Sequence, residues 1–190
     1  VLTVSDSDGY LHCAEGLDME LLETIKELKF AQRGRLQELD GKSGCEFYAE
    51  ARPWEVACDL AFPCATQGEL DEDAAQALIG NNCLGVIEGA NMPTTSKAVA
   101  LFRREKNLFA PGKAANAGGV AVSGLEMTQN SMRLSWERER VEKALSAIME
   151  RIHQQCIEAG DEGDWVDYVK GANHAAFNRI AGAMLSLGPG

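Results

Sequence analysis

The feature that most constrains the fold is a repeated order of segments: a short apolar run, a polar loop and then an amphipathic helix. The apolar runs span residues 56–62, 84–87 and 108–110. Apolar runs without alternation are typical of parallel strands covered on both faces, and strands that alternate with helices build a parallel sheet. We therefore expect an α/β, Rossmann-like protein with a mostly parallel sheet. Ligands of such sheets bind beyond the carboxyl ends of the strands.

The chain opens on a β-branched run at 1–4, which we expect to be a further strand of the same sheet. Ser5, Asp6 and Ser7 follow it in a polar turn. In a dinucleotide-binding fold, the end of the second strand meets the adenosine ribose, and a polar or charged residue there selects the cofactor. An ordinary polar turn is the alternative. Residues 45–49 are a possible edge strand, because the connection from there to residue 56 is too short for a helical crossover.

A helix is expected after Asp18, and it ends in a cluster of cations: Lys29, Arg33 and Arg35. Cations in a last turn suit the helix dipole, which is the simpler interpretation. The other interpretation is that Lys29 and Arg33 meet the 2′-phosphate of NADP, with Ser5 and Ser7 beside them. Asp6 weighs against NADP, because a lone carboxylate at the ribose favours NAD.

Residues 111–124 are mostly small, and two polar side chains, Asn116 and Ser123, stand among them. Small side chains let a ligand or a second helix approach the backbone closely. An amide and a hydroxyl can fix the orientation of a ligand by hydrogen bonds. A close-packed helix start with two incidental polar residues is the alternative.

Charge and cysteine usage exclude several classes of function. The net charge of −11 argues against a nucleic-acid backbone or an anionic membrane as a partner. The six cysteines and three histidines show no spacing typical of a metal site, so we expect no metal and free thiols in a reducing cytosol. Two long helical stripes fill the C-terminal third, at 141–156 and 166–184.

Three motifs together resemble one family. The first is Gly-Lys-Ala-Ala-Asn-Ala-Gly-Gly-Val-Ala-Val-Ser-Gly-Leu-Glu-Met at 112–127. The others are Cys-Ala-Thr-Gln at 64–67 and Glu-Gly-Ala-Asn-Met-Pro-Thr-Thr at 88–95. They resemble the motifs of hexameric, bacterial-type glutamate dehydrogenases, and the resemblance covers essentially the whole chain. One departure is Gly68, where many members carry asparagine.

The resemblance implies site residues. It places Ala65, Thr66 and Gln67 by the adenosine and ribose of the cofactor, Asn91 by the nicotinamide ribose and Asn116 by the nicotinamide. It also implies that Val120 and Ser123 line the pocket for the glutamate side chain. The reaction it implies interconverts L-glutamate with 2-oxoglutarate and ammonia, with NADP expected over NAD, in a cytoplasmic homo-hexamer.

No Gly-x-Gly-x-x-Gly or -Ala pattern lies between a strand and a helix in this sequence. We therefore expect residues 1–124 to be a dinucleotide-binding domain without its first strand and glycine-rich loop. Residues 125–190 are expected to be C-terminal helices that brace a substrate domain. By resemblance, the catalytic lysine and aspartate belong to an N-terminal domain outside these 190 residues, so the chain alone is predicted to be inactive.

Two alternatives remain at this point. Another amino-acid dehydrogenase, of the leucine, valine or phenylalanine type, would have an apolar side-chain pocket, against which Ser123 argues. A non-catalytic nucleotide-binding or oligomer-bracing module is the second alternative.

Overall fold

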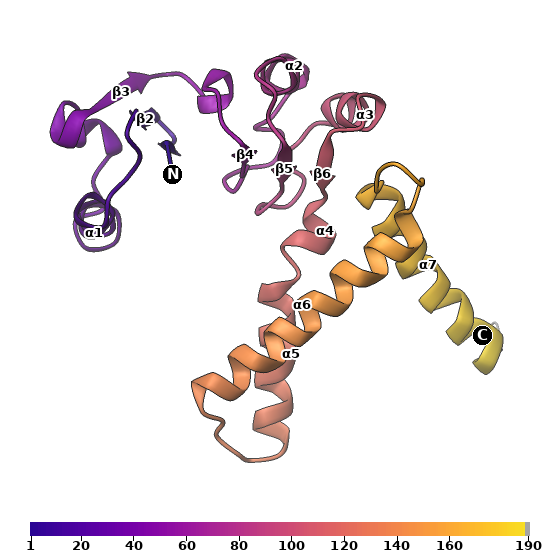
Figure 1. Cartoon of the computed structure of the whole chain (residues 1–190). Helices are drawn as coiled ribbons and strands as arrows, with labels where there is room; N and C mark the ends of the chain where they lie inside the picture. The colour runs from indigo at the N-terminus through magenta and orange to yellow at the C-terminus, as the bar shows by residue number, and fades with distance from the viewer. Residues whose placement is uncertain (189–190) are drawn as a thin grey trace.

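The structure is a computed structural model that describes residues 1–188. Two three-stranded sheets lie side by side along the N-terminal half, and long helices extend from them (Figure 1). The parallel sheet expected from the sequence is present, so the α/β prediction is confirmed. The last two residues of the expected C-terminal part, 189 and 190, lie outside the described residues.

The first sheet is antiparallel, in the order β1 (Thr3–Asp6), β2 (Gly9–Cys13) and β3 (Cys45–Ala49). The prediction that the first strand joins the parallel sheet is therefore wrong for the described chain. The reason is a tight turn at residues 7–8, where the Asp8 amide donates to Asp6 Oδ1 at 3.1 Å and β2 folds back on β1. The predicted edge strand at 45–49 is confirmed.

A disulfide joins Cys13 and Cys45. The prediction that all six cysteines are free thiols is wrong for this pair. Their sequence separation of 32 residues hides the relation, but β2 and β3 pair in a register that sets the two residues opposite each other, with Cα atoms 4.3 Å apart. Both lie in the apolar core of this half, against Leu11, Leu21 and Leu39.

Helical segments cover the antiparallel sheet. Helix α1 (Met19–Lys26) begins at Asp18, whose carboxylate accepts the Leu21 amide at 2.7 Å, and it continues into a π-helical turn, Glu27–Ala31. Short 3₁₀ turns follow at Leu36–Leu39, Lys42–Gly44 and Pro53–Glu55.

The second sheet is parallel, in the order β4 (Leu60–Ala61), β5 (Gly85–Ile87) and β6 (Leu108–Ala110). Helices α2 (Glu72–Gly80) and α3 (Ser96–Arg104) connect these strands, capped by Asp71 and Thr95. The core between the helices and the sheet centres on Leu78, Val86 and Phe102. Strand β4 is shorter than the predicted run at 56–62.

A cavity of about 710 Å³ separates the two sheets. Residues 1–5 line one side of it and residues 60–62 line the other. β1 pairs only with β2, and β4 only with β5, so each sheet ends at this cavity in the part of the chain that the structure describes.

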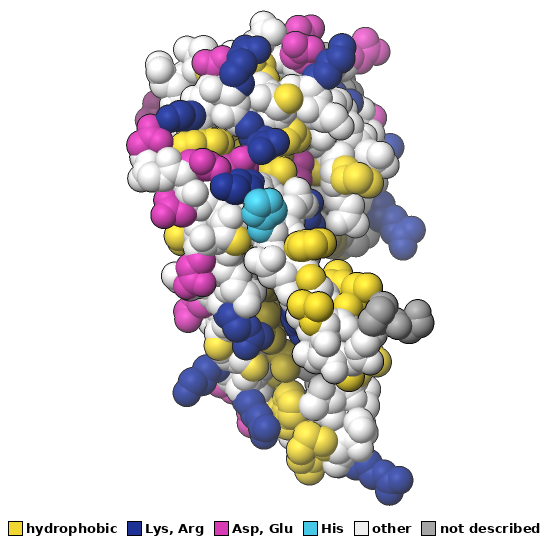
Figure 2. Space-filling model, turned by 90° about the vertical axis from the view of Figure 1, so that its right-hand side faces the viewer, with side chains coloured by type: hydrophobic (Ala, Val, Ile, Leu, Met, Phe, Trp, Pro, Cys, Tyr) yellow, Lys and Arg dark blue, Asp and Glu magenta, His cyan; other side chains and the backbone are white. Residues whose placement is uncertain are grey.

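The C-terminal part consists of α4 (Gly112–Ala115), α5 (Gly118–Ser131), α6 (Arg138–Gly160) and α7 (Tyr168–Leu187). Helices α6 and α7 meet at two glycines, since a Cβ on Gly171 would lie 2.1 Å from the Cys156 carbonyl oxygen and one on Gly160 would lie 2.4 Å from that of Asp167. Among residues 1–188, no helix is both long enough and apolar enough to cross a membrane. Figure 2 shows apolar side chains gathered on the lower half of the molecule, over these helices.

Candidate functional site

The loops that follow the parallel strands bring together two amide side chains. Asn91 lies in the loop after β5, and Asn116 ends α4, which follows β6. The Asn116 Nδ2 donates to Asn91 Oδ1 at 2.8 Å, to the Ala90 carbonyl at 3.2 Å and to the Gly89 carbonyl at 3.3 Å. These contacts arise because β5 and β6 are neighbours and run parallel, so their carboxyl ends share one edge of the sheet.

The remaining atoms of this amide pair can receive a ligand. Within residues 1–188, Asn116 Oδ1 and Asn91 Nδ2 make no hydrogen bond to protein, and Asn91 is exposed. One atom is an acceptor and the other carries donors. That combination is complementary to the carboxamide and hydroxyl groups of a nicotinamide nucleoside, so the chemistry of the two residues fits the group that the motifs imply.

Two buried carboxylates beside these loops were not predicted as site residues: Glu69, which is 6% exposed, and Glu88, which is 5% exposed. Glu69 Oε1 accepts the Ala65 amide at 2.8 Å and so holds the loop after β4. Glu88 accepts two amides from the loops that carry Asn91 and Asn116. For Glu88, its place directly after the apolar strand β5 was the available signal in the sequence, whereas Glu69 lies eight residues beyond β4 and has no such signal.

The predicted adenosine-side residues Ala65, Thr66 and Gln67 lie in the exposed loop after β4. Ala65 and Ser5 both line the 710 Å³ cavity between the two sheets, so they approach the same hollow from opposite sheets. Cys64 lies against the next loop, since a Cβ on Gly89 would be 2.4 Å from its Sγ. The loops after β4 and β5 are therefore in contact.

The polar turn after β1 and the cations after α1 do come together. Lys29 Nζ lies 2.8 Å from Asp6 Oδ2 and also donates to the Gly34 carbonyl at 2.9 Å. Burial on its own raises the pKa of Asp6. Hydrogen bonds from Lys29 and from the Leu36 and Asp8 amides lower it, as does the positive charge of Lys29, and together they outweigh burial, so the pKa of Asp6 is lowered. Asp6 is thus a carboxylate already neutralised by Lys29.

The other cations of the cluster are more exposed. Arg35 donates to Ser7 Oγ at 2.5 Å and lies 3.4 Å from the Asp8 carboxylate. Arg33 has a left-handed backbone, with φ of 55°, and an exposed side chain. The turn therefore holds two cations: Arg35 contacts Ser7, and Lys29 contacts the preceding residue, Asp6.

The predicted substrate residues lie on α5, away from any core. Val120 is 79% exposed, and Ser123 Oγ donates to the Gly119 carbonyl at 3.2 Å, one turn earlier. Helix α5 has no buried residue in the described structure. The two side chains are accessible, and neither of them lines the 710 Å³ cavity between the sheets.

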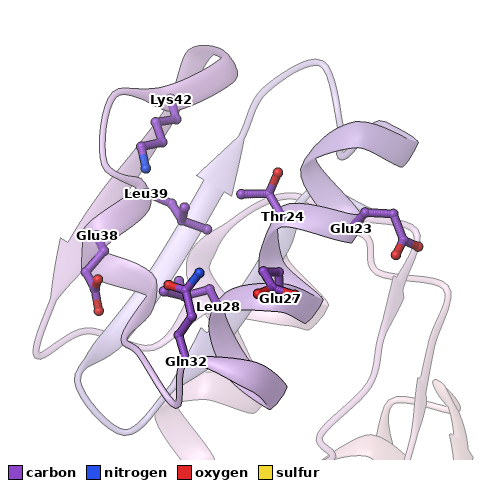
Figure 3. A pocket seen from close by; sticks show the side chains of 8 residues that line it. All are labelled: Glu23, Thr24, Glu27, Leu28, Gln32, Glu38, Leu39 and Lys42. Atoms are coloured by element: carbon purple, nitrogen blue, oxygen red, sulfur yellow. The ribbon is translucent and has the colours of Figure 1, made fainter.

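A second hollow, of about 450 Å³, lies between α1 and the 3₁₀ turns (Figure 3). Its lining holds three glutamates and one lysine, Glu23, Glu27, Glu38 and Lys42, and none of the predicted site residues. Within the described residues, no group of histidine, cysteine and acidic side chains could hold a metal ion. The loops after the parallel strands remain the candidate site.

Comparison with known proteins shows the family of the chain. The family model for glutamate/leucine/phenylalanine/valine dehydrogenases matches residues 1–188. A glutamate dehydrogenase of Bacteroides thetaiotaomicron is 53% identical over 189 residues, which are 99% of this chain and 43% of that protein. The NADP-specific glutamate dehydrogenase of Escherichia coli is 49% identical over 188 residues, 99% of this chain and 42% of that protein.

The solved structures give the same result. Glutamate dehydrogenase 2 of Plasmodium falciparum superposes with a TM-score of 0.92 at 44% identity, covering 98% of this chain and 41% of that one. The chain therefore spans about two fifths of the length of the relatives that it matches. With its parallel sheet, its paired amides and a family match along residues 1–188, the chain belongs to the glutamate/leucine/phenylalanine/valine dehydrogenase family.

Proposed function

We propose that the full-length protein is a glutamate dehydrogenase that interconverts L-glutamate with 2-oxoglutarate and ammonia, using NADP. The observation that carries the proposal is the convergence of Asn91 and Asn116 at 2.8 Å beyond the carboxyl ends of β5 and β6. The names of the relatives support the substrate. When bound, the cofactor supplies the hydride chemistry at the substrate Cα.

The residues of this chain act by binding and orientation. Asn116, held by three acceptors, presents its Oδ1 in a fixed direction toward the nicotinamide, and Asn91 binds the adjoining ribose. Val120 and Ser123 contribute a wall of the pocket for the glutamate side chain, with the Ser123 hydroxyl donating to the distal carboxylate. That role requires Ser123 to exchange its bond to the Gly119 carbonyl for one to the substrate.

The preference for NADP rests on the turn after β1. Ser5 and Ser7 offer hydroxyls, Lys29 pairs with the intervening Asp6, and Arg35 donates to Ser7. Arg33 follows on the same segment with an exposed side chain. Because Lys29 neutralises Asp6, the carboxylate that would repel a 2′-phosphate is screened. Relatives of similar identity carry NADP-specific, NAD(P)-specific and NAD-specific names, so the names alone do not decide the cofactor.

The cavity between the two sheets is where we expect one more strand, the one that carries the glycine-rich turn. The edges of β1 and β4 that face this cavity pair with no other strand of the described chain. Neighbouring strands in a sheet are about 4.8 Å apart, so a strand inserted between these two edges requires them to be about twice that distance apart. We propose that a strand with a glycine-rich turn occupies this cavity in the full-length enzyme. Its backbone amides would hold the pyrophosphate, which no residue of this chain is proposed to bind.

Assembly as a homo-hexamer and a cytoplasmic location are further parts of the proposal. The exposed apolar side chains on α5 and α7 support contact with additional protein surface. The Cys13–Cys45 disulfide is the feature that argues against a reducing compartment, because such bonds are rare in the cytosol. Size measurement of the purified enzyme and fractionation of the source cells test these two statements.

The deciding experiment is a substrate and cofactor panel on the full-length enzyme. We expect glutamate to be oxidised far more efficiently than leucine, valine or phenylalanine, and NADP to be preferred over NAD. Replacing Lys29 and Arg33 together by methionine should lower the NADP:NAD efficiency ratio, since it removes cations and unpairs Asp6. Lys26→Met is the matched control, because Lys26 pairs with Glu23 on the same helix. Preference for an apolar amino acid, or an unchanged ratio in the double variant, would contradict the corresponding assignment.

A further inference from the structure

Glu88 is a buried carboxylate whose position needs a physical reason. It follows β5 directly and is 5% exposed. Among residues 1–188, no lysine, arginine or histidine forms an ion pair with it. An isolated buried charge is costly unless hydrogen bonds compensate it, so the bonds that Glu88 makes indicate what it is for.

The two carboxylate oxygens bind different loops. Oε2 accepts the Gly112 amide at 2.6 Å, and Oε1 accepts the Thr94 amide at 3.3 Å. Gly112 begins the helix that ends at Asn116, and Thr94 closes the loop that carries Asn91. Backbone amides that donate to a carboxylate make charge-assisted hydrogen bonds, which are stronger than those to a neutral acceptor. Glu88 therefore connects the end of the loop that carries Asn91 with the start of the helix that ends at Asn116.

The surroundings of Gly112 show how closely these groups converge. A Cβ on Gly112 would lie 2.7 Å from the Ala90 carbonyl oxygen, 3.3 Å from Glu88 Oε2 and 3.4 Å from Asn116 Nδ2. Ala90 is also one of the carbonyls that accept from Asn116. The carboxylate thus lies directly behind the contact between the two asparagines.

We propose that Glu88 is a positioning residue for the nicotinamide end of the cofactor site: its carboxylate fixes the distance between the loop bearing Asn91 and the helix bearing Asn116. This inference rests on the proposed function, because it assigns those two asparagines to the nicotinamide nucleoside. Glu88 itself touches neither substrate nor cofactor. Its loss changes where the two amides lie and leaves the adenosine side of the site intact.

The test uses the full-length enzyme with Glu88→Gln, which keeps the size of the side chain but loses its charge and turns an NH₂ group toward one of the two amides. We expect kcat for glutamate to fall at least tenfold. We also expect the isotope effect with 2-deuterated glutamate to rise, because hydride transfer becomes slower than product release. Binding of adenosine 2′,5′-bisphosphate, which lacks the nicotinamide, should stay within about twofold of wild type, whereas NADP binding weakens.

Glu69→Gln is the matched control, since Glu69 is equally buried but holds Ala65 in the loop expected at the adenosine. It should weaken adenosine 2′,5′-bisphosphate and leave the isotope effect unchanged. Glu88→Asp keeps the charge but is too short to reach both amides, so its kcat should also fall; it is the variant to use if E88Q does not fold. Full activity in Glu88→Asp, or equal weakening of both ligands by Glu88→Gln with no change in isotope effect, would overturn the inference.

Failure of the proposed function gives a different result. If the wild-type enzyme oxidises another amino acid instead of glutamate, the substrate assignment is wrong, and the same three variants are measured with that amino acid. If wild type oxidises glutamate and Glu88→Gln does so equally well, only the role of Glu88 is wrong.

Discussion

The strand-bearing half and the C-terminal helices of this chain differ in what they bury. The β4–β6 unit has a closed core in which Phe102, Val86 and Leu78 are at most 1% exposed. Helix α5 has no fully buried residue, and on α7 the large side chains Phe177 and Leu185 are 68% and 87% exposed. Exposed apolar side chains of this kind are typical of surfaces that contact further protein. The comparison teaches that the first region is stabilised by its own packing, whereas the helices are stabilised mainly where they touch each other.

The largest expected effect is on the core of the parallel unit. Phe102→Ala removes a ring that is fully buried and stacks on Phe109, with 5.5 Å between ring centroids. We expect the free energy of unfolding to fall by about 3–5 kcal/mol, as for other buried phenylalanines. Urea unfolding measures it.

The matched control for that change is Phe177→Ala on α7. In the 190-residue chain it should change stability by no more than about 0.5 kcal/mol, because the ring is exposed. In the full-length enzyme the loss should be larger. Equal losses from Phe102→Ala and Phe177→Ala in the 190-residue chain would remove the contrast between the two regions.

The next largest expected effect is on catalytic efficiency, and it comes from Ser123 on the exposed helix α5. Ser123→Ala in the full-length enzyme should lower efficiency for glutamate roughly tenfold to a hundredfold, because a hydroxyl-to-carboxylate bond contributes about 1.5–3 kcal/mol. Norvaline, which lacks the distal side-chain carboxylate, should lose far less. Steady-state kinetics with both substrates measures the difference.

Thr128→Ala is the control for Ser123, since Thr128 Oγ1 also bonds back to the carbonyl one turn earlier, that of Gly124 at 2.9 Å. It should leave the preference for glutamate unchanged. If Ser123→Ala behaves like Thr128→Ala, the serine only bonds within the helix, and it leaves the substrate site.

A third change separates the two C-terminal helices. Gly171→Ala places a Cβ 2.1 Å from the Cys156 carbonyl oxygen, so α6 and α7 must move apart, at a cost of about 1–3 kcal/mol. Gly182→Ala, on the same helix, meets nothing within 4 Å and should raise stability by up to about 1 kcal/mol, since alanine is the better helix former. Thermal unfolding that gives both variants the same sign of change would contradict the close packing.

The smallest effect tests the link between the regions. Arg103 on α3 binds Asp167, which caps α7, at 2.6 Å and 3.0 Å. Burial alone raises the pKa of Asp167. Hydrogen bonds from Arg103 and from the Lys170 and Val169 amides lower it, as does the charge of Arg103, and together they outweigh burial, so the pKa of Asp167 is lowered. A depressed pKa stabilises the fold above the unfolded value of about 4, and this contribution is lost as the pH falls through the folded pKa.

Arg103→Met should therefore lower stability at neutral pH by about 1 kcal/mol, a modest value because the guanidinium is half exposed. The acid unfolding midpoint should move to higher pH. Arg104→Met is the control, because its pair with Glu105 is exposed on both sides and should contribute nothing measurable. An unchanged acid midpoint in Arg103→Met would show that Asp167 does not link the two regions.

The sequence by itself determined the local elements, and it predicts where the site lies. Asp18 caps a helix as expected, and the strands predicted at 84–87 and 108–110 pair in parallel, because caps and apolar periodicity act over a few residues. The motifs predict that Asn91 and Asn116 follow two neighbouring strands. Their contact follows from strand adjacency.

Only the tertiary structure decided the relations between distant residues. Strand β1 pairs with β2 and stays outside the parallel sheet, and Cys13 bonds to Cys45. Lys29 forms an ion pair with Asp6, and the Glu88 carboxylate accepts hydrogen bonds from the amides of both Gly112 and Thr94. Each of these depends on which groups the packed chain brings close together. Spacing and residue type do not encode that for Cys13 and Cys45, which are 32 residues apart, or for Asp6 and Lys29, which are 23 apart.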